Sequence, residues 1–311
     1  MNKQRVILDC DPGIDDALAI LLLAASPEIS LEAITVTHGN TTVEKCAKNA
    51  LQLIELAGLT DVPVAKGAHA PLVKALTVAE ETHGDGGLGY AVLPDSTAAL
   101  NPIHAVELII SLVHKFPHEI TMLCIGPMTN LALAIHRDPS IIPLIKNVVS
   151  MGGAIHAPGN ATPASEYNVF CDPHAFDVIL KAGFDLTIVP LDVTYKCLFQ
   201  PKHVDRLSSA RPEIKKFIED STRFYMEFHD EYQGIDGCAI NDPLAAAILI
   251  RPDLVELRNY FVTVELKGHH TTAQTTADHY SATGNKPNSK VAMEVNVDEF
   301  MDFFVERVNQ L

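Results

Sequence analysis

Basic side chains are scarce in this sequence, and patterns typical of secreted or membrane proteins are missing. The chain has 23 Lys and Arg residues against 39 Asp and Glu residues, which gives a formal net charge of −16. This balance argues against nucleic acids and anionic membranes as partners, because both bind basic surfaces. No apolar run reaches the ~20 residues of a membrane-spanning helix, and the start MNKQRVILDC lacks the apolar core of a signal peptide. We therefore expect a cytoplasmic protein.

Cysteine pairs with metal-ligand spacing are also missing. None of the six cysteines forms a CxxC pair, and most lie in apolar segments, so we interpret them as buried thiols. A disulfide framework is rare in a chain of this size. With 311 residues, 47% of them hydrophobic, and no internal repeat or low-complexity tract, the sequence predicts one compact domain over 1–311.

Strand-like and helix-like segments alternate through the first two thirds of the chain. Short apolar, β-branched runs predict strands at 5–10, 31–38, 62–67, 120–126, 148–153 and 185–191. Apolar residues at helical spacing predict helices at 15–25, 42–57, 103–115, 128–136 and 173–182. Nearly continuous apolar strands separated by helices are typical of a parallel sheet buried on both faces. The sequence therefore predicts an α/β fold with a largely parallel central sheet flanked by helices, whose ligands bind at the carboxyl ends of the strands.

The last third of the chain is more helical than the rest. Helices are predicted at 211–230, 240–250 and 297–309, and a strand pair at 259–266 and 289–296. No obvious linker separates this part from the preceding segments, which favours a single domain.

Four aspartates crowd the turn after the first predicted strand. They are Asp9, Asp11, Asp15 and Asp16, and a Pro-Gly turn lies between the second and the third. Capping of the following helix explains Asp15, because carboxylates are favoured at helix N-termini. It does not explain four like charges at one strand end, which repel one another unless a hard cation offsets them. The cluster therefore indicates a metal or acid–base site.

Weaker polar signals lie far from this cluster in the sequence. Asp242 stands between Asn241 and Pro243 before an apolar helix, and an Asp N-cap followed by Pro is a common helix start, so capping is an alternative to ligation. Glu166 and Asn168 lie in a polar loop after a glycine-rich segment, where they are either ordinary loop residues or part of a site. The residue pattern alone leaves both alternatives open.

Eight motifs together make the chain resemble the inosine-uridine preferring nucleoside hydrolases along essentially its whole length. They are DCDPGIDD (9–16), THGN (37–40), HGDGGL (83–88), IGPMTNLALA (125–134), MGGA (151–154), NATPASEYNVFCDPHA (160–175), LDVT (191–194) and TGNKPN (283–288). The resemblance implies a single α/β domain and an enzyme of purine or pyrimidine salvage. Its reaction would be hydrolysis of the N-glycosidic bond of ribonucleosides to ribose and free base.

The resemblance also implies a calcium site. Asp11, Asp16 and Asp242 would bind Ca²⁺ through their carboxylates, and Ile125 would bind it through its backbone carbonyl. A calcium-bound water, activated by Asp11 as general base, would attack C1′ of the ribose. The glycosidic bond would break through an oxocarbenium-like state, which nearby carboxylates stabilise.

Contacts to the ribose follow from the same resemblance. The residues implied are Asp15, Asn40, Met151, Asn160, Glu166 and Asn168. Many contacts to the sugar and few to the base predict an enzyme that is strict for ribose and takes a small-molecule ribonucleoside as its partner. Relatives are usually dimers or tetramers, so we expect a homodimer or homotetramer.

Asn241 departs from the family pattern. Several subgroups carry a histidine there, associated with protonation of the leaving base, and asparagine is not an acid at physiological pH. We expect His83 to be the first catalytic substitute, with an inert loop histidine as the alternative. Tyr225, Phe228 and His229 are expected to contact the base, with helix packing as the alternative. A change in base preference or a reduced rate would follow.

Two other functions compete with hydrolysis. A non-catalytic binding protein for nucleosides or ADP-ribose fits Asn241, but such a protein does not need the general base Asp11. A phosphatase with an aspartyl-phosphate intermediate fits Asp9 and Asp11, but the residues that follow do not match that class. The sequence leaves the preferred base and the leaving-group acid open.

Overall fold

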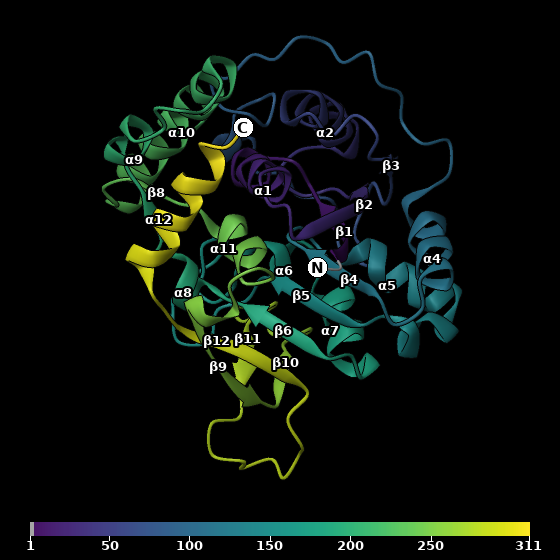
Figure 1. Ribbon diagram of the computed structural model, residues 1–311. Helices are drawn as coiled ribbons and strands as arrows, with labels where there is room; N and C mark the ends of the chain where they lie inside the picture. The colour runs from purple at the N-terminus through teal and green to yellow at the C-terminus, as the bar shows by residue number, and fades with distance from the viewer. Residues whose placement is uncertain (1–2) are drawn as a thin grey trace.

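The computed structural model describes residues 3–311, which are organised around an eight-stranded sheet (Figure 1). The strands follow the order β3-β2-β1-β4-β5-β6-β12-β9, and only the edge strand β9 is antiparallel to its neighbour. This arrangement confirms the predicted α/β fold with a largely parallel central sheet. The strands of the sheet are β1 (Gln4–Cys10), β2 (Ile29–Val36), β3 (Val64–Lys66), β4 (Ile120–Cys124), β5 (Asn147–Met151), β6 (Leu186–Val189), β9 (Val255–Tyr260) and β12 (Ser289–Val295).

Both faces of the sheet are covered by helices. Alternate residues of a strand point to opposite faces, so Val6 and Leu8 of β1 belong to one hydrophobic cluster and Ile7 to the other. The first cluster is completed by α1 (Ile14–Ala24), α2 (Val43–Ala57), α8 (Leu191–Thr194), α10 (Pro212–Gln233), α11 (Asn241–Ala247) and α12 (Val297–Val308). The second is completed by α4 (Ala105–Lys115), α5 (Thr129–Arg137) and α7 (Pro173–Ala182). In the first two thirds of the chain, the ends of the predicted strands and helices agree with the ends of the observed elements to within two residues.

The prediction for the C-terminal strand pair needs a correction. The segment 259–266 is broken at Phe261, so that its first residues end β9 and the remainder forms β10 (Val262–Val264). β12 pairs with β9 and with β6, whereas β10 pairs with β11 (Thr275–Ala277) in a separate hairpin. A second small sheet joins β7 (Leu198–Phe199) to β8 (Cys238–Ala239), and the short helices are α3 (Glu80–His83), α6 (Tyr167–Cys171), α9 (Pro201–Asp205), η1 (Pro139–Leu144) and η2 (Pro252–Leu254).

The order of the strands determines where a ligand can bind. From β1 the chain builds outward through β2 and β3, and it then returns to place β4, β5 and β6 on the other side of β1. The sheet therefore has a switch point between β1 and β4, where the connections after the two strands diverge and leave a crevice. The aspartate-rich turn follows β1 at this edge of the sheet.

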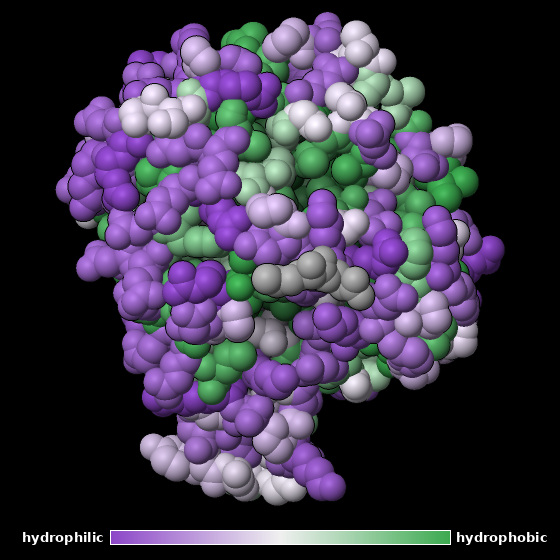
Figure 2. Space-filling view, viewed as in Figure 1, coloured by the Kyte–Doolittle hydropathy of each residue, from purple (hydrophilic) through white to green (hydrophobic). Residues whose placement is uncertain are grey.

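The visible surface is mostly polar (Figure 2). Figure 2 shows that this face of the molecule is mostly hydrophilic, with hydrophobic residues exposed in smaller patches. All six cysteines are buried and free. Among residues 3–311, no helix combines the length and the apolar character needed to cross a bilayer.

Candidate functional site

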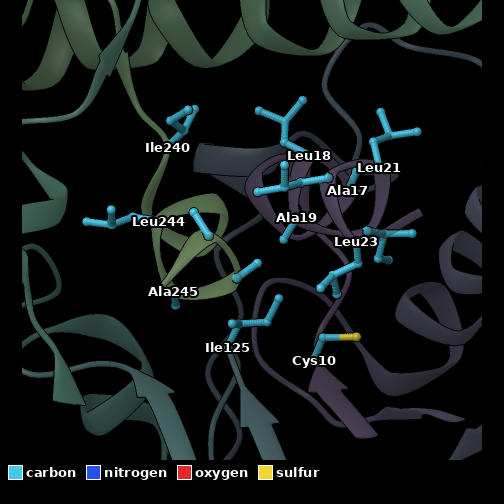
Figure 3. Packing of buried hydrophobic residues seen from close by; sticks show 14 of the residues in the cluster. Cys10, Ala17, Leu18, Ala19, Leu21, Leu23, Ile125, Ile240, Leu244 and Ala245 are labelled. Atoms are coloured by element: carbon cyan, nitrogen blue, oxygen red, sulfur yellow. The ribbon is translucent and has the colours of Figure 1, made fainter. Parts of the chain in front are cut away.

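Packing between α1 and α11 brings two distant acidic segments together. Leu18 and Ala19 of α1 lie beside Leu244 and Ala245 of α11, and all four side chains are fully buried (Figure 3). This contact fixes the first turn of α11 next to the turn that joins β1 to α1. The structure thus brings residues more than two hundred positions apart in the chain into one site.

Three carboxylates converge at this junction. Asp15, Asp16 and Asp242 each offer an oxygen, and these oxygens lie within 4.8 Å of one another. Asp242 stands in the first turn of α11, whose N-cap residue makes no capping bond through its side chain, so the structure does not favour the capping alternative for Asp242. Asp11 lies outside this group of three.

Asp11 is held in place by the loop after β2. Its Oδ2 accepts a hydrogen bond from the backbone N–H of Asn40 at 2.7 Å, while its buried Oδ1 has no hydrogen-bond partner among the described residues. Asp16 accepts from the backbone N–H of Gly13 at 2.9 Å, from that of Asp11 at 3.2 Å and from the Asn40 side chain at 2.9 Å. The bonds that cap α1 are therefore made by Asp16 and not by Asp15.

Burial and mutual repulsion both disfavour the ionised carboxylates. Burial raises the pKa of Asp11 and Asp242 well above the usual range, and the neighbouring aspartates raise it further. Burial, followed by repulsion from Asp15, raises the pKa of Asp16 to about 7. Burial also raises the pKa of Asp15, although the hydrogen bond from Asn241 opposes this effect. Such a group binds either protons or a cation.

Asp9 does not join the other aspartates. Its Oδ1 accepts hydrogen bonds from Thr35 at 2.6 Å and from Asn130 at 2.8 Å. Burial raises the pKa of Asp9 to about 7, and these two bonds act in the opposite direction. Asp9 therefore links β1 to β2 and α5, and the four aspartates of the motif do not all converge on one point.

A pocket that encloses about 570 Å³ of empty space, part of it open to solvent, lies at the carboxylates. Most of the residues that we singled out from the sequence line it, whereas Asp11 and Asp16 are fully buried and are not part of the lining. The residues singled out that line it are Asp15, Asn40, His83, Ile125, Met151, Asn160, Glu166, Asn168, Tyr225, Phe228, His229, Asn241 and Asp242.

One wall of the pocket is polar and fixed by backbone contacts. Glu166 caps α6, accepting from the backbone N–H groups of Asn168, Val169 and Gly153 at 2.7–3.0 Å. The Asn168 side chain donates to the carbonyl of Ile125 at 2.7 Å. These side chains are therefore oriented before any ligand arrives, which favours them as site residues over ordinary loop residues.

A second wall of the pocket is aromatic. The ring of Tyr225 lies between those of His83 and His229, with centroid distances of 5.4 Å and 4.4 Å. His83 comes from α3, and its Nδ1 accepts the backbone N–H of Ile14 at 3.1 Å, which ties this wall to the start of α1. Flat rings offer a packing surface for a planar base.

Asn241 lines the pocket beside the acidic group. Its Nδ2 donates to Asp15 Oδ2 at 3.0 Å and to the carbonyl of Ala239 at 3.4 Å. Asp15 Oδ2 and the Ala239 carbonyl only accept hydrogen bonds, so the amide atom that faces them is the N–H donor. The other amide atom, Oδ1, is buried and has no hydrogen-bond partner among the described residues. Asn241 thus orients Asp15 and offers an acceptor to the pocket.

Five further lining residues were not among those singled out from the sequence: Ala79, Thr82, Tyr167, Tyr195 and Gln233. Gln233 follows Tyr225 and His229 at intervals of four residues, so helical spacing along α10 would have found it. Tyr167 stands between two residues that were chosen, and its hydroxyl donates to the carbonyl of Gly39 at 2.9 Å. Nothing in the sequence pattern marks Tyr195.

Comparison with known proteins assigns the chain to a family. A family model described as inosine-uridine preferring nucleoside hydrolase matches residues 6–302. The chain belongs to this family. It is therefore a nucleoside hydrolase, in agreement with the resemblance found in its motifs, and we refer to it below as the hydrolase.

Individual relatives and solved structures support this assignment. The hydrolase is 37% identical over 307 residues to the pyrimidine-specific ribonucleoside hydrolase RihA of Photobacterium profundum, covering 98% of this chain and 99% of the relative. A purine-preferring ribonucleoside hydrolase from Gardnerella vaginalis has a similar structure, with a TM-score of 0.93, 34% identity and 98% of both chains covered. A plant nucleoside hydrolase matches with a TM-score of 0.92 and 32% identity, covering 98% of this chain and 99% of the other.

Proposed function

We propose that the hydrolase cleaves the N-glycosidic bond of ribonucleosides in this pocket, releasing ribose and free base, with Ca²⁺ as its cofactor. The observation that carries the proposal is the convergence of Asp15, Asp16 and Asp242 within 4.8 Å at the switch point of the sheet. Relatives of similar length are named ribonucleoside hydrolases, which supports ribose as the sugar.

The donor atoms at the site fit a hard divalent cation. We assign Asp11, Asp16 and Asp242 as carboxylate ligands and Ile125 as a carbonyl ligand. Oxygen donors of this kind suit Ca²⁺ and Mg²⁺, and calcium tolerates the less regular geometry. The buried Oδ1 of Asp11, which has no partner within residues 3–311, and the raised pKa values of these carboxylates both favour a positive charge between them. Bound there, the cation would offset the repulsion among the carboxylates and lower the pKa of a neighbouring water.

Asp11 acts as the general base in this proposal. Its Oδ2 accepts the backbone N–H of Asn40, so its carboxylate is held in a fixed orientation. The same carboxylate that would bind the cation would take the proton of the neighbouring water. The hydroxide left after this proton transfer attacks C1′ of the ribose, and the electrons of the glycosidic bond move to the base. The negative side chains around the sugar, such as Asp15 and Glu166, stabilise the positive charge that develops on the ribose.

Ribose recognition is assigned to the polar wall and to the start of α1. Asp15, Asn160, Glu166 and Asn168 offer oxygens to sugar hydroxyls, and Met151 packs on the ring. Asn40 uses its side-chain N–H groups on the Asp11 carbonyl and on Asp16, so its main effect is to hold the aspartates in place. Backbone anchoring of these side chains reduces the entropy lost on binding.

Release of reducing sugar from ribonucleosides, measured with and without a calcium chelator, tests the function directly. We expect ribose release in the presence of Ca²⁺ and at least a 10²-fold loss with the chelator, reversed by added Ca²⁺. The thermal melting temperature should rise with Ca²⁺ in the same preparations, as an independent sign of binding. Nucleoside binding without ribose release would instead favour a non-catalytic binding protein, and release of phosphate from an aryl phosphate would favour a phosphatase.

The base preference needs a substrate panel. Similar proteins are named pyrimidine-specific in one case and purine-preferring in another. We propose that the aromatic wall made by His83, Tyr225, Phe228 and His229 contacts the base. Comparing kcat/KM for inosine, uridine and cytidine would rank the bases, and equal values for all three would remove the aromatic wall as a source of selectivity.

A further inference from the structure

Departure of the base from a ribonucleoside requires a proton. The base takes the electron pair of the C1′–N bond, so an acid beside it speeds bond breakage. Asn241 is not such an acid, because its Nδ2 is committed to Asp15 and Ala239 and a carboxamide does not ionise near neutral pH. Among the residues that line the pocket, the two histidines, His83 and His229, have an ordinary pKa close to neutral pH.

His83 is held in a form that does not gain a proton. Its Nδ1 accepts the backbone N–H of Ile14, which requires this nitrogen to be bare. A proton on Nδ1 would set two N–H groups against each other and break that bond. Burial in addition lowers the pKa of His83 to about 3. His83 therefore presents a neutral Nε2–H to the pocket, which is a hydrogen-bond donor but not an acid that cycles during turnover.

His229 has the opposite arrangement. Its Nδ1 lies 2.8 Å from the backbone carbonyl of Tyr225, and a carbonyl only accepts, so Nδ1 carries hydrogen in both protonation states. Nε2 is then the atom that gains and loses a proton, and the side chain lines the pocket. The ring packs edge-to-face against Tyr225 at 4.4 Å and against Phe228 at 5.7 Å. Protonation of His229 thus breaks no hydrogen bond and needs no movement of the ring.

The groups around His229 set how readily it is charged. Burial lowers the pKa of His229, while the Tyr225 carbonyl and the Asp15 carboxylate on α1 act against this effect. His83 on α3 is neutral for the reason given above. Tyr195, which directly follows α8, and Tyr225, on the same helix as His229, are also neutral, because burial raises the pKa of both phenols. Asp15 is therefore the charged side chain that favours the imidazolium form.

We propose that His229 is the catalytic acid that protonates the leaving base. In this step the proton on Nε2 of His229 moves to a nitrogen of the base as the C1′–N bond breaks. The water oxygen bonds to C1′, and its proton goes to Asp11. His229 then regains a proton from solvent and Asp11 loses one, so the overall reaction consumes one water. This assignment rests on the function proposed above.

Two substrates that differ in their leaving group test the assignment. Inosine and uridine leave as bases that need a proton, whereas 4-nitrophenyl β-D-riboside leaves as a stable phenolate that needs none. His229→Asn keeps an amide N–H for the Tyr225 carbonyl and removes Nε2. We expect kcat for inosine and uridine to fall about 10²- to 10⁴-fold in this variant, and kcat for the nitrophenyl riboside to stay within about threefold. In the unchanged hydrolase, kcat for the nucleosides should fall with rising pH, and that for the nitrophenyl riboside should not.

Three further variants make the result decisive. Glu231→Gln changes an exposed residue of the same helix and should leave both substrates unaffected. His229→Gln is measured alongside His229→Asn in case the latter does not fold, and should show the same selective loss. An equal loss on both substrates, or no loss on nucleosides, would overturn the proposal, and a selective loss in His83→Asn alone would assign the acid to His83. If the unchanged hydrolase released ribose from neither substrate, the proposed function would fail first.

Discussion

Replacing Gly126 by alanine should damage catalysis far more than folding. Gly126 follows the proposed carbonyl ligand at the end of β4, and a Cβ added there would overlap Oδ1 of Asp11 and lie 3.0 Å from its Cγ. The Asp11 backbone nitrogen, 3.1 Å away, directly follows β1 and donates to Asp16, so it cannot easily move away. The carboxylate must therefore move.

The size of the effect follows from this displacement. Carbon–carbon contacts are normally at least ~3.5 Å, so Cγ of Asp11 must move away by about 0.5 Å. Its Oδ1, which the added Cβ overlaps, must move by about 1 Å. A displacement of about 1 Å in a reacting group lowers the rate about 10²-fold. We therefore expect Gly126→Ala to reduce kcat for ribose release by about 10²-fold and to weaken Ca²⁺ binding measured by calorimetry.

A second glycine variant separates strain from catalysis. Gly58 follows α2 with φ of +73°, and nothing lies within 4 Å of a Cβ added there. Gly58→Ala should destabilise the fold by about 1–2 kcal/mol, because alanine is strained in the left-handed region, yet it should keep the normal kcat. The proposed dependence of catalysis on the position of Asp11 would be wrong in either of two cases. In the first, Gly126→Ala keeps kcat within about threefold of the unchanged hydrolase. In the second, its loss of kcat is no larger than that of Gly58→Ala.

Three further predictions follow from the site. Asp242→Asn should abolish the rise in melting temperature caused by Ca²⁺, and an unchanged rise would remove Asp242 from the ligands. Asn241→His should change the ratio of kcat between inosine, uridine and cytidine, because an acid enters the pocket; unchanged values on every substrate would contradict this. Since burial raises the pKa of Asp9 and Asp16 to about 7, the Ca²⁺-free folded protein retains protons that the unfolded chain has lost. Its free energy of unfolding should therefore fall as the pH rises from about 4 to about 7, and Asp16→Asn should make that fall smaller.

The sheet was predictable because its strands are buried on both faces. The segment Ile120–Cys124 is apolar apart from one threonine and entirely buried, which is the pattern that a central parallel strand imposes on a sequence. The segment 259–266 was harder to interpret, since its apolar residues serve two different sheets on either side of Phe261. Local periodicity carries no information about which partner a strand selects.

The site was only partly predictable from residue patterns. The crowding of Asp11, Asp15 and Asp16 within one turn already indicated a cation or an acid, because repulsion makes such a turn costly otherwise. The approach of Asp242 depends on the packing of α1 against α11, which spacing along the chain does not reveal. Only the resemblance to known hydrolases connected the two segments in advance.

Hydrogen bonds from uncharged side chains and backbone groups explain how the fold tolerates so many buried carboxylates. Asn40 donates to Asp11 through its backbone N–H and to Asp16 through its side chain, and Asn241 donates to Asp15 through its side chain. Each of these donors is uncharged, so the aspartates are oriented without being neutralised. A lysine or arginine in either place would stabilise the metal-free protein more strongly, but it would also cancel the charge that attracts the cation. Neutral donors therefore leave the repulsion to be relieved by binding, which couples the stability of the hydrolase to its cofactor.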